Sequence, residues 1–218
     1  MSIRINDLAP DFTAESTAGT IHFHDWLAGD YAIIFSHPRD FTPVCTTEFG
    51  AVAQLAAEWK ARNTKVIGVS VDSVEDHGKW KRDIEAFAGS PADFPIIDDT
   101  SLTVAKAYDM LPADYYLPAE GRTPANTATV RTVYIIGPDK KVRLTMSYPM
   151  SVGRNFAEIL RALDAVQATD GVPLATPANW QVGQDVIVAL SLNNDQAKER
   201  FGDLDIKLPY LRFAKAPK

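Results

Sequence analysis

The chain has 218 residues, of which 46% are apolar and 23% charged, and this composition is typical of a globular protein with one or two domains. Its 22 Lys and Arg against 28 Asp and Glu give a net charge of −6, so we expect no nucleic acid partner. The longest purely apolar runs, such as Ala32–Phe35, are far shorter than the roughly 20 residues that cross a bilayer, so we expect no membrane span.

Cysteine and histidine are both scarce in this chain. Cys45 is the only cysteine, so neither an internal disulfide nor a Cys-x-x-Cys redox pair can form. His22 and His24 would share one face of a strand, but two histidines make a poor metal site, and we expect no metal and no cofactor. The first residues, Met1 to Asp7, include polar side chains where a secretory signal would be apolar, which predicts a cytoplasmic protein.

Strands and helices are predicted to alternate through the first half of the chain. The segment Tyr31–Ser36 is apolar without alternation, which is typical of a strand covered on both faces. The segment Pro43–Asn63 repeats apolar residues at helical spacing, with charged residues elsewhere around the cylinder. The same reasoning predicts a strand at 65–71, a helix from a cap at 72–73 to about residue 88, a strand at 94–97, and a helix from a cap at 98–101 to about residue 110.

A long loop, a hairpin and a helix are predicted to follow. The loop covers residues 111–128, and a loop of this length usually covers a site or a neighbouring subunit, or is mobile. Residues 129–137 and 141–148 are predicted as two strands of a hairpin, and residues 152–167 as an amphipathic helix. This order of elements predicts an α/β fold in which a mixed sheet carries helices on both faces.

The C-terminal segment, residues 169–218, differs from the rest of the chain in composition and in the number of predicted elements. Proline and glycine interrupt it, and only one strand at 185–190 and one short helix at 196–201 are predicted. We expect this segment to be too small to bury a core of its own. The predicted organisation is therefore a main domain at 1–168 and a C-terminal extension at 169–218, which packs on the main domain or on another subunit.

The single cysteine lies at the predicted start of the first long helix, beyond the end of a strand, where open α/β sheets place ligand sites. Pro43 favours the first helical position, which makes Thr42 the N-cap and Cys45 the third helical residue. Unpaired N–H groups and the positive end of the helix dipole favour a thiolate there. The alternatives are that Cys45 is a buried apolar filler and that Thr42 only caps the helix by accepting from the N–H of Cys45.

The residues around this cysteine resemble a known family. The pattern Pro38-x-x-x-Thr42-x-x-Cys45 matches the active-site motif of the peroxiredoxins, and the string from Phe35 to Glu48 resembles their one-cysteine subfamily. Similar segments at 71–77, 94–99, 137–141, 153–161 and 175–180 extend the resemblance over almost the whole chain. It implies a thioredoxin-like domain with a C-terminal extension, working as a homodimer or a ring of dimers.

By position, the resemblance implies four catalytic residues. Cys45 would be the peroxidatic nucleophile, Thr42 would hold the peroxide and the thiolate by its hydroxyl, Pro38 would shield the sulfur from water, and Arg131 would be the active-site arginine. Alternation along the strand around Arg131 puts its side chain on a partly buried apolar side, where a guanidinium needs an anion. The alternative is an arginine at a strand end that reaches water or a surface carboxylate.

Three further residues match substrate-binding positions of the family site, namely His37, Glu48 and Arg154. Each of them also has an ordinary structural explanation. His37 is a polar residue at the end of a strand, and Glu48, in the first helical turn, suits the helix dipole whatever its function. Arg154 stands before a helix, which is a common place for a solvated charge.

The resemblance implies a thiol-dependent peroxidase that serves antioxidant defence and cell redox homeostasis. The Cys45 thiolate attacks hydrogen peroxide or an organic hydroperoxide, becomes a sulfenic acid, and releases water or an alcohol. Because the chain has no second cysteine, an external reductant must regenerate the thiol. Thioredoxin, glutathione and ascorbate are the candidate reductants.

Two other functions stay open, and one feature of some family members is missing. A cysteine-dependent hydrolase or transferase would use His37 as its base, whereas a binding or chaperone-like protein would only pack Cys45. Some peroxiredoxins carry a lipase-type Gly-Asp-Ser-Trp-Gly motif, but here Asp30 stands where the serine would be, although His24 and Asp139 match the rest of that site. Without the hydroxyl nucleophile we predict no phospholipase activity of that kind.

Overall fold

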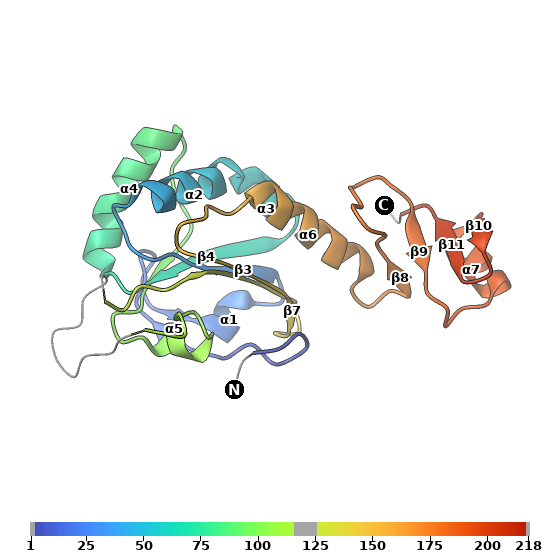
Figure 1. Ribbon diagram of the computed structural model, residues 1–218, viewed down its shortest axis with the longest axis horizontal. Coiled ribbons are helices and arrows are strands. Elements are labelled where there is room, and N and C mark those ends of the chain that lie inside the picture. Colours follow the sequence, from blue (N-terminus) through green and yellow to red (C-terminus); the bar gives the residue numbers. More distant parts are fainter. Residues whose placement is uncertain (1–2, 116–125, 217–218) are drawn as a thin grey trace. The chain divides into compact units, whose positions relative to one another are not determined.

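The computed structural model describes residues 3–115 and 126–216 (Figure 1). The chain divides into two compact units, Met1–Phe156 and Ala157–Lys218, and each is treated by itself below. The predicted loop at 111–128 lies only partly in the described residues, because its central stretch, 116–125, falls outside them. No helix of the described residues is both long and apolar enough to span a bilayer.

A five-stranded mixed sheet forms the centre of the first unit, as the alternation of elements predicts. Its strands run in the order β5-β4-β3-β6-β7. The strands β3, β4 and β5 are parallel, β6 pairs antiparallel with β3, and β7 pairs antiparallel with β6. The strand bounds are β3 Tyr31–Ser36, β4 Thr64–Ser70, β5 Ile96–Asp98, β6 Arg131–Ile136 and β7 Val142–Tyr148.

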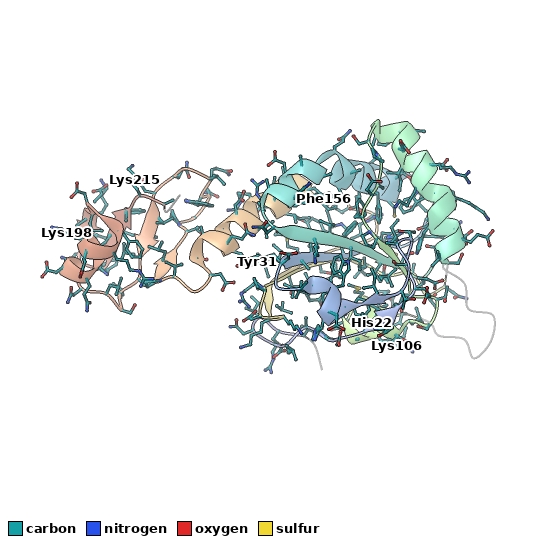
Figure 2. The ribbon with its side chains drawn as sticks, turned by 180° about the vertical axis from the view of Figure 1, so that it is seen from behind. His22, Tyr31, Lys106, Phe156, Lys198 and Lys215 are labelled. Carbon is teal, nitrogen blue, oxygen red and sulfur yellow. The ribbon has the colours of Figure 1, made fainter. Side chains whose placement is uncertain are left out.

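Helices cover both faces of this sheet. The helices α2 (Pro43–Gln54) and α4 (Val74–Ala88) lie on one face, and α1 (Phe23–Leu27) and α5 (Thr103–Ala107) lie on the other (Figure 1). Alternation in β3 explains this division, since Phe35 packs against Phe49 of α2, whereas Ile34 belongs to the core cluster that holds residues of α1 and α5. Figure 2 shows the same sheet from behind, with Tyr31 at the start of β3.

The predicted helix from Pro43 to Asn63 is interrupted at Leu55. The chain forms α2 and then a short α3 (Ala56–Ala61), with Leu55 at φ −91° and ψ 11° between them. The indole N–H of Trp59 donates to the Val52 carbonyl at 3.1 Å, so this side chain binds a backbone acceptor near the end of α2. Helical spacing alone does not reveal the break, because both pieces keep the same apolar side.

The later helix boundaries depend on caps and on left-handed residues. The helix α4 begins where predicted, because the Ser73 side chain accepts from the N–H of Asp76. The carboxylate of Asp99 accepts from the first N–H groups of α5. The helix α5 ends before the predicted residue 110, since Asp109 adopts a φ of 52° that stops the right-handed helix. A two-stranded hairpin, β1 (Thr13–Ala14) with β2 (Ile21–His22), completes this unit.

The second unit is a small antiparallel sheet with two helices. Its strands run in the order β10-β11-β9-β8, and the helices are α6 (Phe156–Thr169), which starts at the last residue of the first unit, and α7 (Asn194–Phe201). The strand bounds are β8 Leu174–Ala175, β9 Val186–Val188, β10 Asp205–Leu208 and β11 Leu211–Ala214. The predicted strand and short helix correspond to β9 and α7, whereas β8, β10 and β11 were not predicted. β8 has only two residues, and β10 is exposed along its whole length.

This unit also has an apolar cluster, contrary to the expectation that the C-terminal segment is too small to bury a core. Its buried members are Leu174, Trp180, Val186, Val188, Ala197 and Ala214. Ala165 and Ala168 of α6 pack against them, which supplies apolar surface that the segment 169–218 lacks by itself. The division between the units accordingly falls near the start of α6, whereas the sequence analysis placed it after that helix.

Candidate active site

The start of α2 positions Cys45. The chain leaves β3 and returns through a short loop to Thr42, which is the extended N-cap, and Pro43 is the first helical residue. Cys45 is therefore the third residue of the helix, as predicted, and it is completely buried. Its sulfur lies in the first turn, where the backbone N–H groups have no helical acceptors.

Thr42 holds the N-cap position without using its side chain as a cap. The expected bond from the Cys45 N–H to this hydroxyl is not formed, and the hydroxyl instead donates to the carbonyl of Arg39 at 2.9 Å. Its oxygen keeps lone pairs that can accept a hydrogen bond. Pro38 lies buried in the same loop, just after β3. The roles of Thr42 and Pro38 toward a peroxide stay predictions.

Arg131, the first residue of β6, brings a cation to the sulfur. Its Nη1 lies 3.3 Å from Sγ of Cys45 and also donates to Oε2 of Glu48 at 2.7 Å. Its Nε donates to the carbonyl of Met150 at 2.8 Å, which fixes the direction of the guanidinium. Arg131 is only 3% exposed, so the alternative of a strand-end arginine reaching water is wrong.

Glu48 joins Arg131 to a second buried arginine, Arg154. The Glu48 carboxylate accepts from the backbone N–H of Arg154 at 2.8 Å and from its guanidinium at 2.9 and 2.7 Å. Burial by itself raises the pKa of Glu48, but the hydrogen bonds and charge of Arg154 outweigh it and hold that pKa below its ordinary value. The carboxylate therefore carries its charge inside the protein.

The ordinary structural explanations offered for Glu48 and Arg154 are wrong, whereas their substrate-binding roles stay predictions. Glu48 is the sixth residue of α2, beyond its first turn, so the two guanidinium groups stabilise its charge rather than the nearby end of the helix. Arg154 is buried rather than solvated, and its guanidinium lies over the ring of Phe35 at 5.1 Å. The arginine is held here because its partner carboxylate and an aromatic face are both buried.

His37 lies in a separate hydrogen-bonded cluster that the sequence analysis did not find. It is fully buried, and its Nε2 lies 2.7 Å from Oδ1 of Asp40. The other carboxylate oxygen of Asp40 lies 2.6 Å from Nδ1 of His77 in α4. No hydrogen bond between His37 and Cys45 is formed in the described residues, so a substrate-binding role for His37 stays a prediction.

Asp40 and His77 were missed because no short-range pattern joins them. They are separated by 37 positions in the chain and meet only through packing of α4 near the loop after β3. Among the described residues, His37, Asp40 and His77 are the one group with ligand atoms within 4.8 Å of one another, as a metal ion would need. Hydrogen bonds account for both short contacts, so the geometry requires no ion.

The residues that match the lipase-type site each have another partner. The Nε2–H of His24 donates to the carbonyl of Ala9 at 2.8 Å. Asp30 forms an ion pair with Lys65 at 3.2 Å, and Asp139 forms one with Arg143 at 2.9 Å. Asp30 therefore serves as the counter-ion of a lysine.

A known family model matches each of the two units of this chain. Residues 5–145 match the AhpC/TSA family, and residues 165–204 match the C-terminal domain of 1-Cys peroxiredoxin. The chain is 47% identical to mitochondrial peroxiredoxin PRX1 of Saccharomyces cerevisiae, over 98% of this chain and 81% of that protein. It is 46% identical to Peroxiredoxin-6 of Rattus norvegicus, over 98% of this chain and 97% of that protein.

Solved structures show the same similarity in three dimensions. A cysteine-to-serine mutant of Peroxiredoxin 6 of Arenicola marina superposes with a TM-score of 0.91 at 41% identity, covering 100% of both chains. The yeast mitochondrial 1-Cys peroxiredoxin superposes with a TM-score of 0.89 at 47% identity, covering 98% of this chain and 100% of the other. That structure is described as the basis of a thiol-resolving mechanism through glutathione and thioredoxin systems.

Proposed function

The chain belongs to the peroxiredoxin family, in its one-cysteine branch, with a thioredoxin-like fold, and we propose that it reduces hydrogen peroxide and organic hydroperoxides at Cys45. Peroxiredoxins are thiol peroxidases, so the reaction class is an oxidoreduction with peroxide as the acceptor. The finer parts of the proposal are the substrates, the roles of the site residues and the reductant.

The reaction begins with a nucleophilic attack on the O–O bond. The Cys45 thiolate attacks the terminal oxygen of the hydroperoxide, the S–O bond forms, and the O–O bond breaks. The sulfur is oxidised to a sulfenic acid that keeps the proton of that oxygen, and the leaving oxide takes one proton to become water or an alcohol. Two electrons pass from sulfur to the peroxide.

The single observation that carries this proposal is the 3.3 Å contact between Nη1 of Arg131 and Sγ of Cys45 in a buried site. The cluster holds two guanidinium groups and one carboxylate, from Arg131, Arg154 and Glu48, which leaves one positive charge in excess. A thiolate at Cys45 makes the cluster neutral. The same guanidinium stabilises the negative charge that moves onto the leaving oxygen.

Thr42, Pro38 and His37 complete the proposed site. The Thr42 hydroxyl, which donates to the carbonyl of Arg39, holds the peroxide and the thiolate. Pro38 is buried in the loop before Thr42 and excludes water from the sulfur. Glu48 and Arg154 act through Arg131 by fixing its guanidinium, and His37 contributes from the neighbouring buried cluster.

An external thiol reduces the sulfenic acid, because this chain has only one cysteine. Glutathione and thioredoxin are the reductants favoured by the description of the yeast relative. We further propose a homodimer or a ring of dimers, and a role in antioxidant defence and cell redox homeostasis. A cytoplasmic location stays a prediction, since the name of the yeast relative assigns that protein to the mitochondrion.

Intact-mass spectrometry tests the proposal directly. The protein is exposed briefly to one equivalent of hydrogen peroxide or of cumene hydroperoxide, with Cys45→Ser as the control. We expect one added oxygen, trapped as sulfenic acid, in the wild type and none in the variant. A thiol that stays inert to both peroxides would refute the proposal, as would activity on an acyl substrate with an acyl-enzyme at Cys45.

A second assay separates the candidate reductants. Turnover of peroxide is followed with glutathione, with a thioredoxin system and with ascorbate, each added to the same oxidised protein. Turnover with either thiol and none with ascorbate is the expected result. Turnover with ascorbate alone would show that the reductant is wrongly assigned, although the peroxidase reaction would stand.

A further inference from the structure

A buried polar cluster beside the active site has hydrogen-bond contacts that restrict where its protons lie. It consists of His37 after β3, Asp40 in the following loop, and His77 in α4, with exposed fractions of 0%, 1% and 0%. Asp40 bridges the two imidazoles, through Oδ1 to His37 at 2.7 Å and through Oδ2 to His77 at 2.6 Å. No other ionised side chain contacts either imidazole in the described residues.

The contact of His77 with a backbone carbonyl places its first proton. Nε2 of His77 lies 3.0 Å from the carbonyl oxygen of Ile97, and a carbonyl can only accept, so Nε2 carries a hydrogen. The contact between Nδ1 of His77 and Asp40 then needs one more proton between two otherwise accepting atoms. Either His77 is an imidazolium or Asp40 is a neutral acid.

The surroundings favour the ion pair. Burial raises the pKa of Asp40, but the hydrogen bonds from His37 and His77 bring it below its ordinary value. Burial lowers the pKa of His77, yet the bond to Asp40 outweighs this and raises it. Both directions place the proton on His77 and leave Asp40 as a carboxylate.

The carboxylate in turn fixes the tautomer of His37. An ionised Asp40 only accepts, so Nε2 of His37 must donate to it. Burial holds the pKa of His37 below its ordinary value despite Asp40, so this ring is neutral. Its Nδ1 is then a bare acceptor, and this buried atom has no hydrogen-bond partner among the described residues. An unpartnered buried acceptor calls for a ligand or a water.

The ring of His37 lies beside the face of α2 that carries Cys45. It contacts Phe49 edge-on with ring centroids 4.6 Å apart, and Phe49 follows Cys45 by four residues, so both lie on one helix face. It also stacks on Trp80 at 5.0 Å, and the indole N–H of Trp80 donates to Thr46, the residue after Cys45. These contacts place His37 against the first two turns of α2.

We propose that Asp40 and His77 are positioning residues for peroxide reduction. Their ion pair keeps the proton of His37 on Nε2, so that Nδ1 of His37 accepts a hydrogen bond from the O–H of the bound hydroperoxide. This rests on the proposed function at Cys45. No proton is transferred to His37 in this step, because the imidazole only orients the peroxide. Asp72 is the other titratable group nearby. It accepts from the N–H of Asp40 and the hydroxyl of Ser70, and it raises the pKa of both imidazoles through its charge without a hydrogen bond to either ring.

Nitrogen-15 NMR of the labelled histidines tests the proton arrangement without any peroxide. The four histidine signals are assigned by single substitutions, and the spectra are recorded near pH 7. The expected result is a doubly protonated His77 and a neutral His37 with a bare Nδ1. A neutral His77, or a His37 with its proton on Nδ1, would overturn the inference.

Variants test the consequence for the reaction. Replacing His77 by Leu removes the cation, so the pKa of Asp40 rises and its protonated form donates to Nε2 of His37, which moves the His37 proton to Nδ1. We expect the second-order rate constant of Cys45 oxidation in H77L to fall about tenfold near neutral pH, the size of one lost hydrogen bond, with the acid limb of its pH profile shifted to higher pH. In Asp40→Asn, which keeps the shape of the side chain, the NMR signal of His77 should become that of a neutral ring.

Asp72→Asn is the matched control, since it also neutralises a buried carboxylate next to Asp40. It should keep the His37 tautomer and shift the acid limb much less than H77L does, because Asp72 acts on the two imidazoles through its charge alone. A folded H77L protein with the wild-type rate and acid limb would overturn the inference. If instead wild-type Cys45 takes up no oxygen at all, the proposed function fails in every variant, whereas failure of this inference alone leaves wild-type oxidation intact.

Discussion

Replacement of Glu48 by Gln is the most informative change to the buried ion cluster. The two carboxylate oxygens accept four N–H groups, two on Oε1 from Arg154 at 2.8 and 2.9 Å, and two on Oε2 from Arg131 and Arg154, both at 2.7 Å. An amide has one oxygen, so its NH₂ group must face two N–H donors. The substitution also leaves two buried guanidinium groups without their shared counter-charge, since Arg131 and Arg154 are 3% and 7% exposed.

The magnitude follows from this geometry. Removal of one partner from a buried ion pair typically costs about 3–5 kcal/mol, because a charge is left buried without compensation. We expect Glu48→Gln to lower the free energy of unfolding by about that amount, measured by urea denaturation followed by tryptophan fluorescence. The rate of Cys45 oxidation should fall as well, since Arg131 loses the carboxylate that fixes its guanidinium.

Glu158→Gln provides the matched control for this experiment. Glu158 also forms a short ion pair with an arginine, to Arg161 at 2.6 Å, but its side chain is 40% exposed. An exposed pair contributes less than about 1 kcal/mol, so this variant should be nearly as stable as the wild type. The reasoning about the buried cluster is refuted if E48Q unfolds at the same urea concentration as E158Q.

Three further predictions concern the same site. Because the pKa of Glu48 is lowered in the folded state, its ionised carboxylate stabilises the fold fully above the unfolded-state pKa of about 4.3. This contribution is lost as the pH falls through the lower folded-state pKa. The difference in unfolding free energy between the wild type and E48Q should therefore shrink in acid titrations. Arg131→Lys should slow peroxide-driven oxidation of Cys45 by about 10²–10³-fold in stopped-flow measurements. The reason is that one ammonium group cannot keep the contacts to Cys45, Glu48 and Met150 together. An unchanged rate would show that Arg131 has no part in the mechanism. Thr42→Val should slow the same step about tenfold while changing the free energy of unfolding by less than about 1 kcal/mol, because the hydroxyl does not cap α2, and Thr42→Ser should restore the rate.

Local sequence signals correctly predicted the strand and the helix start that position Cys45. The apolar run of β3, the Thr-Pro start of α2 and the third helical position of Cys45 follow from periodicity and capping, which depend on neighbouring residues only. Alternation also placed Arg131 on the same side of β6 as Val133 and Ile135, although the structure buries both sides of this strand. The break at Leu55 was not visible, because the apolar residues on both sides of it keep the same helical spacing.

The amino-acid sequence alone determined the alternating α/β order, the helix start that holds one thiol, and the family resemblance, since each of these depends on residues close together in the chain. Only the tertiary structure decided which charges meet. Arg131 reaches Cys45 across 86 positions, Arg154 reaches Glu48 across 106, and Asp40 reaches His77 across 37. The physical reason is desolvation: a charge buried by packing must find an opposite charge in space, and the position of that partner in the chain leaves no local pattern to read.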